Sequence, residues 1–219
     1  MDLYLSDAVT FVRARIDELP YNNDDMISPA DDDRNFDKTV EKLLPEAAEV
    51  TIMAAPAELL EPQDAMTYKQ GSALPSGIGS VSVDNSVVTV MIPLGTGFLR
   101  LVAFKSDDSD IYVTNPVPFN SPEARMQANG YVRGTYDNPV LVERRLPSAT
   151  EFKYYSIRSS SPGFTIYKID KPSYSGDMTI FCPKQLEVAV LNRLVGMVLD
   201  AYGDQRSQLF YQKSNSYQA

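Results

Sequence analysis

The chain has 219 residues and a formal net charge of −9, and 43% of its residues are hydrophobic, which is typical of a folded globular protein. Histidine is absent and cysteine occurs once, which excludes Ser-His-Asp and Cys-His nucleophile systems, histidine metal ligands, an intrachain disulfide and cysteine-rich zinc sites. No apolar run approaches the ~18 residues of a membrane span and no basic region opens the chain, so we expect a protein of a reducing cytoplasm, without a membrane partner.

Two helical regions are expected in the N-terminal part. Apolar residues recur with helical spacing over residues 6–19, where Ser6 is the candidate cap and Pro20 ends the helix. A second region runs from about residue 32 to 55, and within it Pro45 must either kink the helix or start a new one.

The middle of the chain, from about residue 71 to 177, has the pattern of short strands. Helical periodicity disappears, and β-branched and aromatic runs alternate with Gly, Pro, Asn and Ser. The clearest expected strands are residues 86–92, 98–104, 110–114, 152–158 and 165–169.

A third helix is expected over residues 183–202, after which Gly203 either caps it or lets it continue. Its apolar face is wide, and we expect its core residues to include Leu191, Leu194, Val195 and Val198. Residues 204–219 are polar with scattered aromatic side chains, a composition that suits a segment ordering on a partner.

The sequence therefore predicts an α+β fold in which both chain ends form a small helical bundle and a β-rich domain is inserted. Residues 1–64 supply the N-terminal helices, residues 65–180 the insertion, and residues 181–219 the long C-terminal helix and tail.

The negative charge lies mainly near the N-terminus. Residues 1–64 hold 16 acidic and 5 basic side chains, whereas residues 65–219 hold 13 acidic and 15 basic ones. This argues against nucleic-acid binding through phosphate contacts. It leaves three interpretations: a surface for a basic partner, a surface that DNA passes without sticking, or a solvated face.

The motifs that could carry chemistry have simpler interpretations. The aspartates near residue 31 lack EF-hand spacing and favour a helix start over a metal site. Gly77-Ile-Gly79 and Gly95-Thr96-Gly97 do not complete a nucleotide-binding motif and favour turns. Cys182 is expected to be a buried thiol, and Arg144-Arg145 a surface pair rather than an anion contact. We expect no metal, no cofactor and no catalytic residue.

The helical ends carry a resemblance to a known family. They comprise Asp7 to Val12, Asp32 to Phe36, Val40 to Val50, and the long helix from Pro183 to Tyr202 with its polar, aromatic tail. This layout resembles the head–tail connector proteins of tailed bacteriophages, which are adaptor or ring proteins beneath the portal. It is most similar to the ring proteins of crAss-like phages, where a β-rich insertion sits on the helical core. The resemblance covers about half of the chain.

The resemblance implies a non-enzymatic virion protein at the head–tail junction, assembled in the cytoplasm of the bacterial host. Such proteins form a ring, commonly of twelve copies, that contacts the portal and other ring or tail proteins. Genomic DNA passes through the ring without specific binding. Two alternatives remain: a collar or fibre-attachment protein whose β-rich domain binds a partner, and a carboxylate-dependent hydrolase, which ranks third.

The expected functional residues are interface residues. The aromatic and apolar side chains that we expect to reach a partner are Tyr202, Leu209, Phe210 and Tyr211. Arg206 and Lys213 are expected to pair with carboxylates on that partner. An acidic face toward the channel or a basic partner is expected from Asp24, Asp25, Asp31, Asp32 and Asp33.

Overall fold

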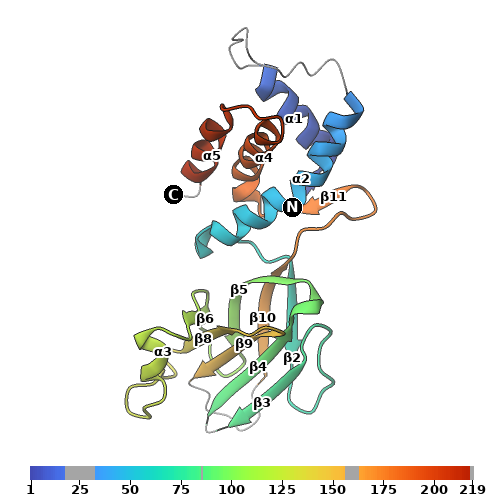
Figure 1. Cartoon of the computed structure of the whole chain (residues 1–219). Coiled ribbons are helices and arrows are strands. Elements are labelled where there is room, and N and C mark those ends of the chain that lie inside the picture. The colour runs from blue at the N-terminus through green and yellow to red at the C-terminus, as the bar shows by residue number, and fades with distance from the viewer. Residues whose placement is uncertain (18–32, 85, 156–162, 218–219) are drawn as a thin grey trace. The chain divides into compact units, whose positions relative to one another are not determined.

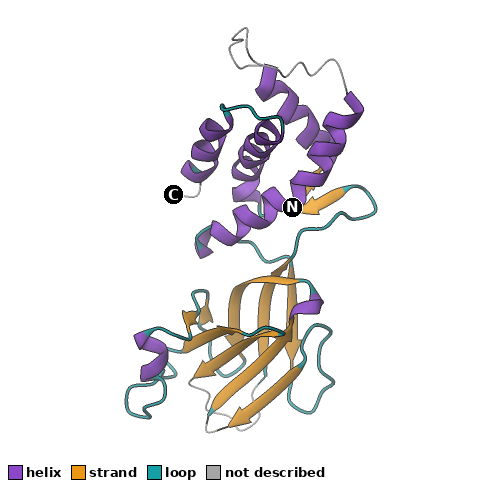
Figure 2. Cartoon of the chain, in the orientation of Figure 1, coloured by secondary structure: helices purple, strands orange, loops and turns teal. Residues whose placement is uncertain are grey.

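The computed structural model of the chain describes residues 1–17, 33–84, 86–155 and 163–217 (Figure 1). The chain divides into two compact units, one formed by Met1–Glu61 with Lys171–Ala219 and the other by Pro62–Asp170. We call them the helical unit and the β unit, because most helices belong to the first and most strands to the second (Figure 2). The α+β class is therefore confirmed, with helices at both ends of the chain and a β-rich middle.

The β unit ends at Asp170, before the expected end of the insertion at residue 180. The reason is a small antiparallel sheet in the helical unit, where β1 (Asp2–Tyr4) pairs with β11 (Thr179–Phe181). The central residues of these strands lie opposite each other and are buried. Strands of three residues are too short to show an alternating pattern, so the sequence did not indicate this pairing.

The other described elements of the helical unit are the three expected α-helices, one further α-helix and two short 3-10 helices. They are α1 (Leu5–Asp17), α2 (Asp33–Ala54), η1 (Ala57–Leu59), η3 (Lys184–Leu186), α4 (Glu187–Ala201) and α5 (Ser207–Ser216). Ser6 does not cap α1, because the helix directly follows β1 and Ser6 is its second residue. The expected end of this helix at Pro20 lies outside the described residues.

Helix α4 forms the centre of this unit and contacts α1, α2 and α5. The four residues expected in its core are all buried, which confirms that part of the prediction. Its wide apolar face is explained by these three neighbours, since one flat contact would bury a narrower stripe.

Gly203 ends α4. Its φ of +75° lies in the left-handed region, which favours glycine. The Gly203 amide donates to the Asp200 carbonyl and the Asp204 amide to the Leu199 carbonyl, both at 2.9 Å. These two bonds form a Schellman motif, so the glycine caps the helix and the chain turns back into α5.

Pro45 neither ends α2 nor starts a new helix, because α2 continues through it. A proline nitrogen carries no hydrogen, so the Glu41 carbonyl, four residues earlier, loses its usual helical donor. The Tyr174 hydroxyl donates to that carbonyl at 2.6 Å. A side chain distant in sequence thus replaces the hydrogen bond that the proline removes.

The β unit consists of two sheets. The four-stranded sheet has the order β2-β10-β5-β6 and the five-stranded sheet the order β3-β4-β9-β8-β7, and only β7 and β8 run parallel among these pairs. The strands are β2 (Asp64–Tyr68), β3 (Ser80–Asp84), β4 (Val87–Pro93), β5 (Phe98–Ser106), β6 (Tyr112–Val113), β7 (Val117–Pro118), β8 (Val140–Arg145), β9 (Ala149–Tyr155) and β10 (Phe164–Asp170). Two short helices complete the unit, η2 (Leu94–Thr96) and α3 (Pro122–Met126).

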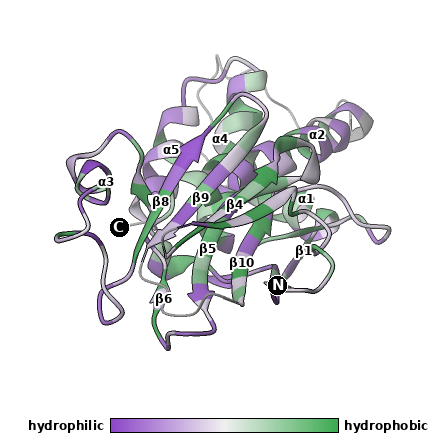
Figure 3. Ribbon diagram, turned by 90° about the horizontal axis from the view of Figure 1, so that it is seen from below, coloured by the Kyte–Doolittle hydropathy of each residue, from purple (hydrophilic) through white to green (hydrophobic). Residues whose placement is uncertain are grey.

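One apolar cluster joins the two sheets. Phe104 of β5 stacks on Tyr154 of β9 and on Phe164 of β10, with ring centroids 4.9 and 5.3 Å apart. Val88, Val90 and Ile92 of β4 add aliphatic side chains from the other sheet. Figure 3 shows hydrophobic stretches on β4, β5 and β10, as the alternation of inward and outward side chains requires.

All five expected strands have a counterpart, in β4, β5, β6, β9 and β10. Within the described residues, no helix has the length and apolar character needed to cross a membrane.

Candidate functional site

The C-terminal segment expected to reach a partner instead folds onto its own chain. Residues 207–216 form α5, which packs along α4. Phe210 is only 1% exposed and belongs to the core, so it does not extend toward another protein. The buried Ser214 hydroxyl donates to the Ala189 carbonyl of α4 at 2.9 Å. The segment therefore orders on α4 without needing a partner.

The two cations expected to pair with a partner are also used within the chain. The Arg206 Nε donates to both carboxylate oxygens of Asp204, at 3.0 Å each. Hydrogen bonds from Arg206 lower the pKa of that carboxyl group. The Lys213 ammonium lies over the Phe210 ring, 4.8 Å from its centroid. The short spacing in sequence explains both contacts, and pairing of these cations with carboxylates of another protein stays a prediction.

Tyr211 joins α5 to α4. Its hydroxyl donates to Asp200 Oδ2 at 2.7 Å. The pKa of Tyr211 rises to about 12, mainly because the phenol is buried and secondly because of this hydrogen bond. Its ring lies against Gly196, where an added Cβ would be 2.8 Å from the ring. Sequence reasoning missed Gly196, although a glycine inside a strongly apolar helix indicates close approach of another element.

Tyr202 and Leu209 remain available at the surface, with exposed fractions of 41% and 52%. The Tyr202 ring also stacks on Phe36 of α2, with centroids 6.4 Å apart. Tyr217, which the sequence did not single out as a contact, is exposed as well. Tyr202 and Leu209 are thus predicted contact residues that another protein can reach, and Tyr217 adds a third exposed side chain.

The predicted acidic face falls mostly outside the described residues. This applies to Asp24, Asp25, Asp31 and Asp32, whereas Asp33 is the first residue of α2. The charge nevertheless divides clearly between the units. The helical unit holds 19 acidic and 10 basic side chains, and the β unit holds ten of each. The whole net charge of the chain therefore belongs to the helical unit.

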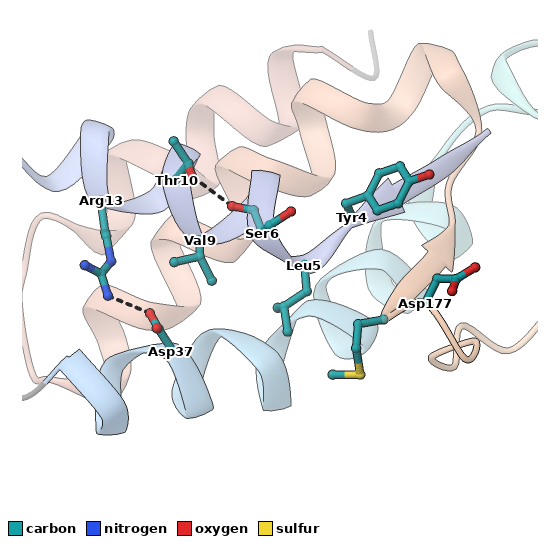
Figure 4. Close-up of a pocket in the computed structure, with 9 residues that line it drawn as sticks. Tyr4, Leu5, Ser6, Val9, Thr10, Arg13, Asp37 and Asp177 are labelled. Carbon is teal, nitrogen blue, oxygen red and sulfur yellow. Dashed lines mark hydrogen bonds and ion pairs between the residues drawn. The ribbon is translucent and has the colours of Figure 1, made fainter.

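A pocket of about 640 Å³ lies in the helical unit beside α1 (Figure 4). Leu5 and Val9 supply apolar surface, and the Arg13 guanidinium donates to Asp37 Oδ1 at 2.7 Å. Met178, also in the lining, has a φ of +53°, an unfavourable value for a residue with a side chain. The sequence did not indicate this pocket, because its residues come from three separate segments.

A second pocket, of about 470 Å³, lies in the β unit beside the edge strand β7. Its lining comprises Pro116, Pro118, Phe119, Asn120, Glu143, Arg144 and Arg145. The Arg144 guanidinium lies over the Phe119 ring, 4.5 Å from its centroid. The Arg145 Nε donates to Glu143 Oε1 at 3.0 Å. The structure thus places the expected surface pair in a pocket, and we call these lining residues the arginine pocket.

The remaining candidate motifs have structural roles. Gly77 and Gly97 have φ values of +96° and +79°, as turn positions require. Cys182 is buried, and its burial raises the pKa of the thiol to about 12. Among the described residues, no group of three or more carboxylate or thiol side chains could hold a metal ion.

No family model matches the chain, and no curated protein matches it significantly.

Proposed function

We propose that the chain is a structural ring protein of a tailed-phage virion, located at the head–tail junction beneath the portal. The observation that supports this function best is the construction of the helical unit from both ends of the chain, with the β unit inserted as a separate compact unit. This is the layout on which the resemblance to connector proteins rests. Helices from both ends of the chain pack in one core, so this core remains continuous although the β unit is inserted between them in the sequence.

The distribution of charge is consistent with a channel protein. A surplus of nine acidic side chains in the helical unit gives a surface that repels DNA phosphates if it faces the channel. The exposed Tyr202, Leu209 and Tyr217 supply the kind of aromatic and apolar side chains that anchor interfaces. Copies would meet through two different patches, as a closed ring requires.

A collar or fibre-attachment protein is the second candidate, favoured by one feature of the β unit. The connection between β7 and β8 contains α3 and extends away from the sheets (Figure 1). Tyr131 in this connection is 100% exposed, and Met126 and Val132 are also exposed. Apolar side chains on a protruding connection suit recognition of another protein.

A carboxylate-dependent hydrolase ranks third. The pocket beside α1 contains Asp37 and Asp177, but Asp37 is paired with Arg13. A pair of free carboxylates, the minimum for this chemistry, is therefore missing from the described lining of that pocket.

Mass determination in solution, of the chain alone and with the portal ring of its own virion, tests the proposal. We expect a monomer when the chain is alone and dilute, weak self-association at high concentration, and a near-integral number of copies on the portal ring, because many weak contacts add up once each copy is docked. A chain that ignores the portal would contradict the connector function and favour the recognition function of the β unit.

A further inference from the structure

The arginine pocket contains a cation that has no carboxylate partner among the residues that the structure describes. Within the described residues, Arg144 makes its contact with the Phe119 ring and has no ion pair. The Phe119 amide donates to the Glu143 carbonyl at 2.9 Å, so the ring is fixed beside the strand that carries the arginine. The ring thus holds the guanidinium in place, and no described residue occupies the N–H groups that a ligand would use.

Arg145 also lines the pocket, although successive side chains of β8 alternate between the two faces of the sheet. Its Nε is engaged by Glu143, and its two terminal nitrogens have no recorded partner in the described part of the chain. The exposed Asn120 adds a side-chain amide to the lining. Planar guanidinium groups match the two oxygens of a carboxylate or phosphate, so the pocket has the chemistry of an oxyanion site.

The charge of the β unit favours protein carboxylates over nucleic-acid phosphates. Binding to a phosphate backbone needs many clustered Lys and Arg residues, whereas this unit has ten basic and ten acidic side chains. Glu143 lies in the pocket wall itself and would repel a polyanion. A few carboxylates on a protein surface are the better match.

The helical unit of a second copy offers such a surface. Glu46 of α2 is exposed, and Val50 is 41% exposed one turn further along the same helix. The Glu46 carboxylate lies close enough to Tyr211 to raise the pKa of that phenol, although less than burial and Asp200 do. We call Glu46, Val50, Asp200 and Tyr211 the acidic face. Arg193 also lies near Tyr211, but its guanidinium donates to Asn215.

We propose that the arginine pocket of one copy binds carboxylates on the acidic face of the next copy, with Glu46 as the partner of Arg144. This inference rests on the proposed ring, because contact between two different patches of the same chain generates head-to-tail association. Each copy then has one pocket occupied and one acidic face covered when the ring closes.

Exchange of the two charges between copies tests this contact. Variant R144E replaces a positive charge of the pocket by a negative one, and variant E46K replaces a negative charge of the acidic face by a positive one. Both side chains are exposed. K69E and E58K are matched controls, with the same charge changes at exposed positions in the same two units outside the two patches. Sedimentation velocity at rising concentration measures self-association, and mass determination on the portal ring measures templated association.

We expect R144E and E46K each to weaken association about tenfold or more when alone, because like charges then face each other. An equimolar mixture should return to within about threefold of the unchanged chain, since each variant supplies the charge that the other needs. The controls should associate normally.

Each other outcome has a definite meaning. If the unchanged chain associates and R144E associates equally well, the inference is overturned while the ring function stands. If R144E and E46K fail alone and recover when mixed, yet no chain joins the portal, the contact is real and the proposed function fails. The inference would also be overturned if the mixture of R144E and E46K did not regain association. The same holds if the unchanged chain bound a short DNA duplex and R144E did not.

Discussion

Replacing Tyr174 with phenylalanine removes one hydroxyl group, and we expect this change to destabilise the helical unit by about 1 kcal/mol. The hydroxyl donates to the Glu41 carbonyl, which has no helical donor because Pro45 lacks an N–H group. Burial is the main reason that the pKa of Tyr174 rises to about 12, so the phenol keeps its proton at neutral pH. The site is only partly buried, so water can replace some of the lost bond, which limits the magnitude.

A double-mutant cycle with Pro45 separates this bond from the other contacts of the tyrosine. In P45A the alanine amide can donate to the Glu41 carbonyl, so the phenol is no longer the main donor. We therefore expect Y174F to cost about 1 kcal/mol in the natural chain and close to zero in P45A, a coupling typical of residues that share one acceptor.

Urea unfolding followed by far-ultraviolet circular dichroism measures this coupling, because the long helices that dominate the signal lie in the helical unit. Y217F is the matched control, since the Tyr217 side chain is exposed, and it should leave the free energy of unfolding almost unchanged. An equal loss from Y174F in the presence and absence of Pro45 would refute the argument that the phenol replaces the missing amide.

Three further predictions concern the helical unit. G196V should cost about 1–3 kcal/mol in urea unfolding, because its side chain collides with the Tyr211 ring; an unchanged midpoint would contradict this. Folding raises the pKa of the Cys182 thiol, so the neutral thiol contributes its full share of stability below pH 9 and loses it as the pH rises toward about 12. The free energy of unfolding of C182A should therefore fall less steeply over this alkaline range. L209S should lower the occupancy of the portal ring and leave the free energy of unfolding unchanged, whereas the control Q208A should leave both unchanged. Equal occupancy for L209S and the unchanged chain would exclude this contact.

The sequence predicted those elements that are determined by residues close together in the chain. The apolar spacing of residues 183–202 correctly predicted which face of α4 is buried, including Leu191 and Val198. The sequence left open whether Gly203 caps the helix or lets it continue, and the hydrogen bond from the Asp204 amide to the Leu199 carbonyl shows that it is a cap. Such features follow from periodicity and from the special conformations of glycine.

The sequence left open whether α2 continues through Pro45 or a new helix starts there, because the compensating donor is far away in the sequence. Tyr174 and Glu41 are separated by 133 positions. Strand β8 was missed for a related reason. Leu141 and Val142 are both buried although they point to opposite faces of the sheet, so no alternation marks the strand.

The C-terminal contact residues show why a partner surface is difficult to identify from sequence. An aromatic side chain in a polar segment has the same pattern whether it contacts its own chain or another protein. Tyr211 contacts its own chain because α4 offers space at Gly196 and a carboxylate at Asp200, and Phe210 is buried. Leu209, beside them, remains exposed. The informative signal therefore lay in the helix that receives the segment, where one small residue interrupts a row of large ones, and not in the segment itself.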